Sequence, residues 1–448
     1  MQNIFRAYDI RGLLDTEINK ENVKKIGKAF GTFLKGSGTV VVSRDTRRNG
    51  IELKKSLVEG LTSTGVNVID IGMQSTPVLN FYCKHANATA GAQITASHNP
   101  PEYSGVRFRK NDGVGFPEAI PEVKKLFFSE NFITGNGNLK KIDSDIPQEE
   151  YIRYITEKIK IKKPLTVVID PGNGATSEFA KRLFLDAGCN VVAINNEPNS
   201  EFSGRGPNPS KEKLIDLEQE VRINQADLGI AFDGDGDRVV IVDDKGKTLN
   251  ADEIGYLIAE ELLKENIGTI AINVECSDLI RKIIDDKGGE LKYIRVGDAF
   301  LAKAVKENDA IFAMEASNHF LIPKYFPFDD GIMTGLFFTR MMSNKEMELS
   351  EIRKKIPANC KKKVKINCDD ELKFKVIKNL KERFKKEHKI IEIDGMRINF
   401  KNSWVLIRAS NTSPYIRITV EAETKKELQI KIEKFRNSVI EEIERLKK

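Results

Sequence analysis

The segment LTVVIDPGNGATSEFAKRLFLDAGCNVVAIN, residues 165–195, decides the fold. It opens with an apolar run rich in β-branched residues, passes through a polar loop into a helix-length stretch, and ends in a second apolar run. Such alternation predicts a βαβ unit in a largely parallel sheet. The same order of elements recurs at residues 38–72 and 268–297. The sequence therefore predicts three topologically similar α/β domains with mixed, largely parallel sheets.

The three repeats carry polar loops directly after their first strands: SRDTRRNG at 43–50, DPGNGAT at 170–176 and NVECSD at 273–278. Ligands of open parallel sheets bind beyond the carboxyl ends of the strands. These loops are expected either to face a ligand or to support the loops that do, although their glycines and asparagines are also typical of helix caps.

The C-terminal part differs in composition. Residues 360–388 are rich in lysine, and we interpret them as a solvated helix face. Short strand-like runs follow, and residues 425–446 have the length and pattern of a helix. This predicts a smaller α+β domain. The predicted domains are domain I (1–150), domain II (151–250), domain III (251–360) and domain IV (361–448).

Composition limits the classes of partner. The 448 residues carry a net charge of +6, from 72 basic and 66 acidic residues spread along the chain, so no charged block marks a nucleic-acid arm. The opening MQNIFRAYDIRG is charged and lacks a signal-peptide core, and no apolar run approaches the ~20 residues that span a bilayer. We expect a cytoplasmic protein with neither nucleic-acid nor membrane partners.

Cysteine and histidine usage excludes two further classes of site. The five cysteines are odd in number and include no C-x-x-C pair, so neither a disulfide framework nor a zinc site is predicted. The chain has only four histidines, which makes a histidine-rich metal cluster implausible.

The strongest chemical signal is ADLGIAFDGDGDRVVIVDD, residues 226–244. Asp233, Asp235 and Asp237 alternate with glycines between two strands, and glycine lets the backbone turn sharply enough for the carboxylates to converge. Converging carboxylates require a cation, and a small set of hard oxygen ligands suits Mg²⁺. An EF-hand calcium loop would need glycine and glutamate where Arg238 and Asp244 stand, and a plain Asp-Gly hairpin would not need three carboxylates.

The stretch QITASHNPPEYSG, residues 93–105, follows a strand and holds Ser97. Serine, asparagine and proline are typical of a tight turn, because short polar side chains bond to nearby backbone and proline presets φ. Residue types alone leave open whether Ser97 is a nucleophile or only part of a turn.

Three other constellations suit an anionic or sugar ligand. RASNTSPYIR, residues 408–417, brackets hydroxyl and amide donors with Arg408 and Arg417, as a phosphate site would, although a surface turn could hold the same residues. In AMEASNHF, residues 313–320, Glu315 and Ser317 would point the same way in an extended segment and could grip sugar hydroxyls. FRAYDIRG, residues 5–12, offers arginines and a tyrosine that fit either salt bridges or ligand contacts.

Together these motifs resemble the α-D-phosphohexomutase family, which comprises the phosphomannomutase/phosphoglucomutase and phosphoglucosamine mutase enzymes. The resemblance rests on TASHNP (95–100), DGDGDR (233–238), a variant of GExSGH (314–319) and an R-x-S-N-T-x-P loop (408–414), in this order along the whole chain. It implies three similar α/β domains and a smaller fourth one around a central cleft.

The resemblance also implies a mechanism. Ser97 would be carried as a phosphoserine, with one Mg²⁺ held by a phosphoserine oxygen and by Asp233, Asp235 and Asp237. The enzyme would interconvert hexose 1-phosphate and hexose 6-phosphate through a bound 1,6-bisphosphate, which would also serve as activator. The division of one isomerisation into two transfers is covalent catalysis, and phosphoryl transfer depends mainly on positioning and charge stabilisation.

The same resemblance assigns individual residues. The implied catalytic residues are Ser97, His98, Arg107 and Arg11. The implied substrate-binding residues are Tyr8, Arg238, Gly297, Asp298, Glu315, Ser317, His319, Arg408, Ser410, Asn411, Thr412 and Arg417.

The chain departs from the family pattern in two places. Where the family usually continues toward N-G-x-K, this chain has Ser104 and Arg107, and an arginine is a poor general base. We therefore predict an electrostatic or phosphate-binding role for Arg107, and proton transfer is left to His98 or water. Met314 and Asn318 replace the usual glycines of the sugar loop, and are expected to narrow the pocket or move its backbone.

Small clues bear on the substrate. The opening segment FRAYDIRG, with Tyr8, is similar to that of the phosphomannomutase/phosphoglucomutase branch. In contrast, Asp298 stands where the glucosamine branch also tends to carry aspartate. We predict mannose or glucose phosphates as substrates and keep phosphoglucosamine mutase as the alternative. A sugar phosphatase and a non-catalytic sugar-phosphate binder are more remote alternatives, and the protein is expected to be a monomer or a homodimer.

Overall fold

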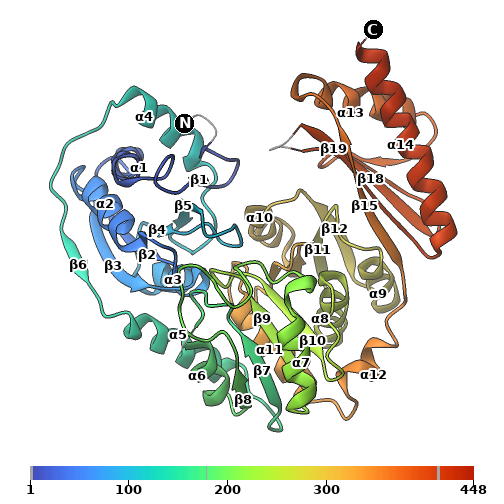
Figure 1. Cartoon of the computed structure of the whole chain (residues 1–448), viewed down its shortest axis with the longest axis horizontal. Coiled ribbons are helices and arrows are strands. Elements are labelled where there is room, and N and C mark those ends of the chain that lie inside the picture. Colours follow the sequence, from blue (N-terminus) through green and yellow to red (C-terminus); the bar gives the residue numbers. More distant parts are fainter. Residues whose placement is uncertain (1–3, 178, 411–413, 448) are drawn as a thin grey trace.

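The computed structural model describes residues 4–177, 179–410 and 414–447. Four separate β-sheets follow one another along the chain (Figure 1). The predicted boundaries remain predictions; residue 150 lies inside helix α5 (Asp145–Lys158), and residue 360 is the first residue of a strand. The four-domain α/β architecture is confirmed.

Domain I contains a mixed six-stranded sheet in the order β1-β5-β4-β2-β3-β6. Its strands are β1 (Ile10–Leu13), β2 (Thr39–Arg44), β3 (Asn67–Met73), β4 (Ala90–Ile94), β5 (Tyr103–Lys110) and β6 (Leu139–Lys141). Its helices are α1 (Lys20–Phe33), α2 (Gly50–Thr62), α3 (Thr76–His85) and α4 (Ala119–Ser129), and α5 leads into domain II.

Domains II and III each contain a four-stranded sheet, in the orders β10-β9-β7-β8 and β12-β11-β13-β14. The elements of domain II are β7 (Thr166–Asp170), α6 (Phe179–Asp186), β8 (Asn190–Ala193), the 3₁₀ helix η2 (Lys211–Lys213), α7 (Ile215–Ile223), β9 (Leu228–Phe232) and β10 (Val239–Asp243). The elements of domain III are α8 (Ala251–Glu265), β11 (Thr269–Asn273), α9 (Leu279–Lys287), β12 (Glu290–Ile294), α10 (Asp298–Asn308), β13 (Ala310–Met314), β14 (Phe320–Leu321), α11 (Gly331–Ser343) and α12 (Leu349–Arg353).

The three sheets share one arrangement. Each contains a unit of three parallel strands followed by one antiparallel strand, in the orders β3-β2-β4-β5, β8-β7-β9-β10 and β12-β11-β13-β14. In domain I, β1 and β6 extend this unit at its two edges. The βαβ units predicted from the sequence are β2-α2-β3, β7-α6-β8 and β11-α9-β12. The predicted repeat is therefore confirmed at the level of strand order and direction.

The predicted functional loops occupy equivalent places in the three domains. Thr95 follows β4, Asp233 follows β9 and Glu315 follows β13, and each loop leads into the antiparallel strand of its sheet. The loops therefore leave the carboxyl ends of parallel strands, where open α/β sheets bind their ligands. The repeat thus explains why three dissimilar motifs meet at one site.

Local signals in the sequence fix the helix ends that flank these loops. Helix α8 begins with a capping box in which the side chain of Asn250 accepts from the backbone of Glu253 and Glu253 reciprocates. Helix α3 begins after Ser75, whose hydroxyl accepts from the backbone N–H of Val78.

Domain IV is a five-stranded antiparallel sheet in the order β15-β19-β18-β17-β16. Its elements are β15 (Cys360–Asn367), α13 (Asp370–Phe384), β16 (Ile390–Ile391), β17 (Met396–Asn399), β18 (Ser403–Ala409), β19 (Tyr415–Ala422) and α14 (Lys425–Lys447). The lysine-rich segment 360–388 was interpreted as a helix face, which is wrong for its first part. Residues 360–367 form a strand, because they pair along their whole length with β19.

The packing of the domains is uneven. One hydrophobic core runs through domains II and III and is joined by Phe81 of α3 and Tyr151 of α5. The Tyr151 hydroxyl also donates to Asp330 at 2.8 Å, within this core. Domain IV has a separate core and lies beside domain III, on the opposite side of the molecule from domain I in Figure 1. Its contact with domain III combines a small apolar cluster of Val274, Trp404 and Leu406 with the ion pairs described below.

Among the described residues, no helix combines the length and the apolar character that crossing a bilayer requires. All five cysteines are free thiols in this structure.

Candidate active site

Ser97 lies in a tight turn at the end of β4. The turn is closed by a hydrogen bond from Asn99 N–H to the Ala96 carbonyl, and Ser97 itself adopts a left-handed backbone conformation with φ of 49°. Its side chain is 2% exposed, and its hydroxyl donates to Asp233 Oδ2 at 2.8 Å. The turn and the nucleophile are therefore compatible, because the turn presents the hydroxyl to the next domain.

Asp233, Asp235 and Asp237 converge as predicted. All three are fully buried, and each offers a carboxylate oxygen within 4.8 Å of the other two. Burial and the charges of the other two aspartates raise the pKa of Asp233 well above its usual range. Asp235 Oδ1 and Asp237 Oδ1 are buried and have no hydrogen-bond partner among the residues that the structure describes. Unpaired buried carboxylate oxygens are costly, so this donor set fits a bound divalent cation.

The two glycines of DGDGDR are required for different structural reasons. A Cβ on Gly234 would lie 2.7 Å from the Ser97 carbonyl oxygen, so a side chain there would push the two loops apart. Gly236 has φ of +80°, a conformation that glycine adopts without steric cost.

Arg107 connects three domains through its guanidinium. Nη1 donates to Asp237 Oδ2 at 2.7 Å and to Asp235 Oδ2 at 3.0 Å, and Nη2 donates to Asp298 Oδ2 at 2.6 Å. Burial lowers the pKa of Arg107, but the three carboxylates outweigh this effect and raise it well above its usual range. Arg107 is therefore permanently charged, and it partly neutralises the aspartate cluster from the side of domain I.

The residues around Ser97 include His98 and Arg11. His98 Nδ1 lies 3.2 Å from the Ser97 hydroxyl, and nearby Arg238 together with burial lowers the pKa of His98 far below its usual range. His98 is therefore a neutral imidazole. Arg11 donates to the side chain of Asn99 at 2.6 Å and pairs with Asp9.

His319 joins the metal loop to the sugar loop through a pair of hydrogen bonds. Arg238 Nε donates to His319 Nε2 at 2.9 Å, and His319 Nδ1 lies 2.5 Å from Asp329 Oδ2. Burial lowers the pKa of His319, but Asp237 and Asp329 outweigh it and raise that pKa to about 9. The Arg238 contact requires an acceptor at Nε2, which only the neutral ring with its proton on Nδ1 offers, so Arg238 opposes the protonation that the two carboxylates favour.

Asp237, His319 and Asp329 also lie close enough to hold a metal ion. In this structure, however, His319 Nδ1 is bonded to Asp329, and Asp237 is paired with Arg107. The group therefore forms a hydrogen-bonded network adjoining the aspartate cluster.

The extended segment expected for Glu315 and Ser317 is wrong, and their role in sugar binding remains a prediction. Residues 315–318 form a turn and not an extended segment, closed by Asn318 N–H donating to the Glu315 carbonyl at 3.2 Å. Ser317 still meets Glu315, since its hydroxyl donates to Oε2 at 2.9 Å. The other carboxylate oxygen of Glu315 accepts from the backbone N–H of Gly297 at 2.5 Å.

The structure accommodates Met314 and Asn318, the two residues that stand where the family usually has glycine. The Met314 side chain is fully buried inside domain III, where a Cβ on Gly255 would lie 2.1 Å from its sulfur. Asn318 adopts φ of 68°, a left-handed conformation that asparagine tolerates better than most residues. The expected narrowing by Met314 is therefore wrong, because its side chain points into the core.

Tyr8 bridges domain I and domain III. Its hydroxyl donates to the Val296 carbonyl at 3.0 Å, and its ring packs edge-on against Phe300 at 5.8 Å between centroids. Gly297 lies against this ring, since a Cβ there would be 2.8 Å from Tyr8 Cζ.

The arginines of domain IV contact domain III. Arg408 Nη1 and Arg417 Nη1 lie 2.9 and 3.5 Å from Glu275 Oε1, and Arg408 Nη2 lies 3.0 Å from Asp394 Oδ2. Ser410 N–H donates to the Tyr415 carbonyl at 3.0 Å. The predicted residues Asn411 and Thr412 lie outside the described residues.

Three residues that contact predicted site residues were not identified from the sequence. Arg47 contacts Ser97, Glu275 contacts Arg408, and Asp329 contacts His319. Arg47 and Glu275 belong to the loops SRDTRRNG and NVECSD, which were expected only to face or support a ligand site. Their position after the first strand of each repeat was the available signal. Asp329 lay in no recognised motif.

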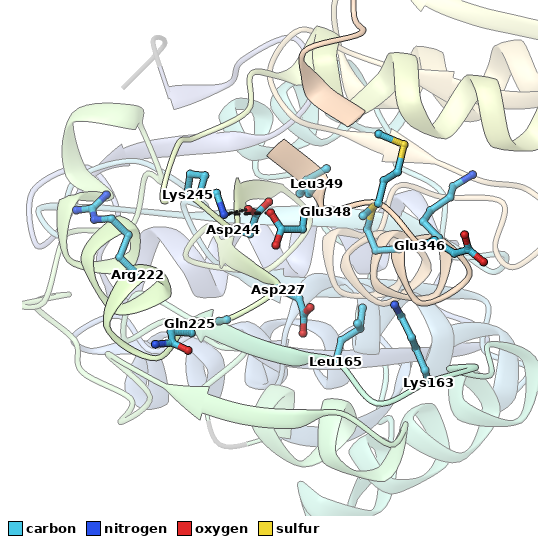
Figure 2. Close-up of a pocket in the computed structure, with 14 residues that line it drawn as sticks. Lys163, Leu165, Arg222, Gln225, Asp227, Asp244, Lys245, Glu346, Glu348 and Leu349 are labelled. Atoms are coloured by element: carbon cyan, nitrogen blue, oxygen red, sulfur yellow. Dashed lines mark hydrogen bonds and ion pairs between the residues drawn. The ribbon is translucent and has the colours of Figure 1, made fainter. Parts of the chain in front are cut away.

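A cavity of about 560 Å³ lies elsewhere, between α7 of domain II and the loop that precedes α12 of domain III (Figure 2). Leu165 and Asp227, which line it, precede β7 and β9, so it adjoins the opposite end of the sheet from DGDGDR. Its charged residues partly pair with one another, as Lys245 does with Asp244 and Glu348 at 3.0 Å. None of the predicted site residues that the structure describes lines this cavity.

Comparison with known protein families covers nearly the whole chain. Four family models match, described as the alpha/beta/alpha domains I, II and III and the C-terminal domain of phosphoglucomutase/phosphomannomutase. They match residues 2–134, 149–246, 250–360 and 364–437. The chain belongs to the phosphoglucomutase/phosphomannomutase family. It is therefore an enzyme of the mutase class of isomerases.

Individual relatives agree with this assignment. The chain is 37% identical over 438 residues to a protein of Thermococcus kodakarensis named phosphoglucomutase/phosphomannomutase, covering 95% of each chain. It is also 37% identical over 446 residues to a probable phosphoglucosamine mutase of Thermococcus gammatolerans, covering 97% of this chain and 98% of the relative. A solved structure of a phosphoglucomutase/phosphomannomutase family protein from Burkholderia thailandensis superposes with a TM-score of 0.91 at 30% identity, over 99% of this chain and 98% of the other.

The approach of Gly234 to Ser97 gives a first prediction. Gly234→Ala places a methyl group 2.7 Å from the Ser97 carbonyl, and the loops must separate. We expect kcat for sugar-phosphate isomerisation to fall about 10-fold to 100-fold, since small displacements of a reacting group are costly. The matched control is Gly115→Ala, whose nearest new contact is at 3.5 Å. Equal activity of the two variants would contradict the close packing of the loops.

The unpaired carboxylate oxygens give a second prediction. Saturating Mg²⁺ should raise the Tm of the wild-type protein by about a few degrees, because an ion that binds only the folded state stabilises it. Asp235→Asn should lose most of this shift while leaving the metal-free protein at least as stable, since it removes one of three mutually repelling charges. Asp216→Asn, on the exposed face of α7, should keep the full shift. An unchanged shift in Asp235→Asn would place the metal elsewhere.

Proposed function

We propose that this mutase interconverts hexose 1-phosphate and hexose 6-phosphate, with mannose and glucose phosphates as substrates, through a phosphorylated Ser97 and a bound hexose 1,6-bisphosphate. The observation that carries the proposal is the 2.8 Å hydrogen bond between the Ser97 hydroxyl and Asp233. It places a buried hydroxyl against a cluster of carboxylates that fits a divalent cation.

The proposed metal is Mg²⁺, held by Asp233, Asp235 and Asp237 together with an oxygen on Ser97. When bound, it would neutralise the charge of the transferring phosphoryl group and polarise its oxygens. The hard oxygen donors of the cluster and the two unpaired carboxylate oxygens support this choice. The bisphosphate would also act as activator, because it is the species that phosphorylates Ser97.

The protein's own residues would direct the transfer. A sugar hydroxyl oxygen attacks the phosphorus of phospho-Ser97, the bond between phosphorus and Ser97 Oγ breaks, and the proton released by the sugar hydroxyl restores the Ser97 hydroxyl, which donates to Asp233. In the return step Ser97 Oγ attacks the other phosphate, the bond between that phosphorus and its sugar oxygen breaks, and the proton released by Ser97 restores the sugar hydroxyl. Arg107 supplies fixed positive charge beside the cluster and takes no part as a base.

Sugar and distal phosphate would be bound by separate loops. Glu315 and Ser317 offer a carboxylate and a hydroxyl for ring hydroxyls, and Arg408 and Arg417 offer paired guanidinium groups for the phosphate that is not reacting. Because the distal phosphate is held apart from Ser97, either end of the sugar can be presented to the nucleophile.

The environment of Asp298 favours a neutral sugar over glucosamine. Its carboxylate accepts from Arg107 at 2.6 Å and lies 3.7 Å from Arg109 Nη1. Arg107 and Arg109 outweigh the effect of burial and lower the pKa of Asp298, so it stays ionised and paired. A carboxylate already paired with two guanidinium groups has little net charge to offer the ammonium group of glucosamine phosphate.

Phosphorus NMR tests the proposed reaction. The protein is incubated with mannose 1-phosphate, Mg²⁺ and a trace of mannose 1,6-bisphosphate, and in parallel with glucose and glucosamine 1-phosphates. We expect the 6-phosphates of mannose and glucose to appear with little free phosphate, and Ser97→Ala to lose at least about 10³-fold in rate. Free phosphate as the main product would indicate a phosphatase. Preferential turnover of glucosamine 1-phosphate would assign the chain to the other branch.

Glu275 gives a further prediction about phosphate binding. Burial raises the pKa of Glu275, but Lys363 and Arg408 outweigh it and lower that pKa to about 2, so its carboxylate stays charged against the arginines. Substrate phosphate must compete with this carboxylate for Arg408 and Arg417. Glu275→Gln should therefore lower KM for hexose phosphate about fivefold, equivalent to roughly 1 kcal/mol, and strengthen inhibition by inorganic phosphate.

The matched control is Glu423→Gln, which removes a carboxylate from an exposed pair with Lys282 at 3.0 Å. It should leave KM and phosphate inhibition unchanged. A higher KM in Glu275→Gln would contradict competition and show instead that the carboxylate orients the arginines for substrate.

A further inference from the structure

The Ser97 turn is held by the buried guanidinium of Arg47, which belongs to the loop SRDTRRNG after the first strand of the repeat in domain I. Arg47 follows β2 and is 2% exposed. Its Nη2 donates to the carbonyls of Ser97 at 2.6 Å and Asn99 at 2.7 Å. Its Nη1 donates to the carbonyls of Pro100 at 2.8 Å and Tyr103 at 2.9 Å.

The fifth N–H group of the Arg47 guanidinium, at Nε, is also bonded. Arg47 Nε donates to Asp45 Oδ2 at 3.1 Å, so all five N–H groups of the guanidinium are in hydrogen bonds. Asp45 also accepts from the Thr95 hydroxyl at 2.7 Å, on the other side of Ser97. The Asp45–Arg47 pair therefore makes hydrogen bonds to the turn both before and after Ser97.

The contacts coincide with a strained backbone. Ser97 has φ of 49°, a conformation that costs a residue with a side chain free energy and persists only where surrounding contacts impose it. The Ser97 carbonyl is the group that Arg47 Nη2 holds, and the same carbonyl lies against Gly234 of the metal loop. Fixing this carbonyl fixes the peptide plane that follows Ser97, and the hydrogen bond from the Ser97 N–H to the Thr95 hydroxyl at 2.9 Å fixes the plane before it. Together the two planes set the direction of the Ser97 side chain toward Asp233.

We propose that Arg47 is a positioning residue for the nucleophile: its guanidinium imposes the left-handed backbone at Ser97 and so aims the Ser97 oxygen at the aspartate cluster. Phe202 of domain II covers the guanidinium, with its ring centroid 5.1 Å from Arg47 Cζ. The same contact therefore ties the turn to the domain that carries the cluster. The inference deepens the proposed function, on which it rests.

A lysine cannot replace Arg47 in this role. An ammonium group keeps the positive charge beside Asp45, but it donates from one point and cannot reach four carbonyls spread over residues 97–103. Arg47→Lys therefore separates the geometric role of the guanidinium from its charge. Arg48→Lys is the matched control, because Arg48 is the next residue, its side chain is 56% exposed, and it makes only a 3.8 Å contact with Asp15.

The test measures kcat and KM for mannose 1-phosphate, the share of turnovers that end in free phosphate, and the Tm of each variant. We expect Arg47→Lys to lower kcat about 10-fold to 100-fold, as a displaced reacting group would. KM should stay within about twofold of the wild-type value, since the sugar and phosphate loops are untouched. The share of free phosphate should rise: water oxygen attacks the phosphorus of phospho-Ser97, the bond to Oγ breaks, and a proton from water restores the serine hydroxyl.

Arg48→Lys should match the wild-type protein in all of these measurements. If Arg47→Lys does not fold, Phe202→Leu takes its place, since it loosens the cover over the guanidinium without removing a hydrogen bond; the same split in kcat and KM is expected at smaller size. Equal kcat in the Arg47 and Arg48 variants, or a rise in KM as large as the fall in kcat, would overturn the inference. Failure of the wild-type protein to isomerise the sugar phosphate would instead refute the proposed function.

Discussion

The convergence of three buried carboxylates beside one serine hydroxyl is the constraint on which the rest of this structure depends. Asp233, Asp235 and Asp237 repel one another, and burial removes the water that would screen them. The structure lowers this cost with fixed positive charge from Arg107 and with hydrogen bonds from the Ser97 and Thr76 hydroxyls, and a cation bound at the unpaired oxygens would lower it further. Every one of these partners except the cation comes from domain I. The metal loop of domain II is therefore incomplete until the two domains pack together.

The same requirement explains how the remaining domains are joined. Arg107 reaches Asp298 of domain III, and Arg238 reaches His319, so domain III is connected to the cluster by charged hydrogen bonds as well as by the shared core. Domain IV is joined to domain III through ion pairs of its arginines and lysines with Glu275, and through a small apolar cluster of Val274 with Trp404 and Leu406. A phosphate oxygen can replace the Glu275 carboxylate as the partner of Arg408, whereas it cannot replace the apolar contact. The part of the protein proposed to bind the distal phosphate is thus held to domain III partly by ion pairs that a phosphate can replace.

Much of this organisation could be predicted from the sequence because it follows from periodicity and local spacing. The three βαβ repeats and the spacing of Asp233, Asp235 and Asp237 both appear as local patterns, and the structure confirms their arrangement. Contacts between distant segments could not be predicted in this way. Arg47 contacts the turn at Ser97, 50 positions away along the chain, and Asp329 contacts a ring nitrogen of His319, 10 positions away. Only the folded backbone brings these groups together. The conformation of the sugar loop was mispredicted for a related reason: alternation of Glu315 and Ser317 suggests a strand, but the left-handed Asn318 closes a turn.

The central claim is that Ser97, aimed at the aspartate cluster, is the residue that carries the phosphoryl group between the two ends of the sugar. Peptide mapping by mass spectrometry tests it most directly, after the protein has been incubated with Mg²⁺ and hexose 1,6-bisphosphate and quenched in acid. The account predicts one added phosphoryl group, located at Ser97, which disappears when excess hexose monophosphate is added before the quench. A phosphoryl group on another residue, or one on Ser97 that hexose monophosphate does not remove, would contradict it.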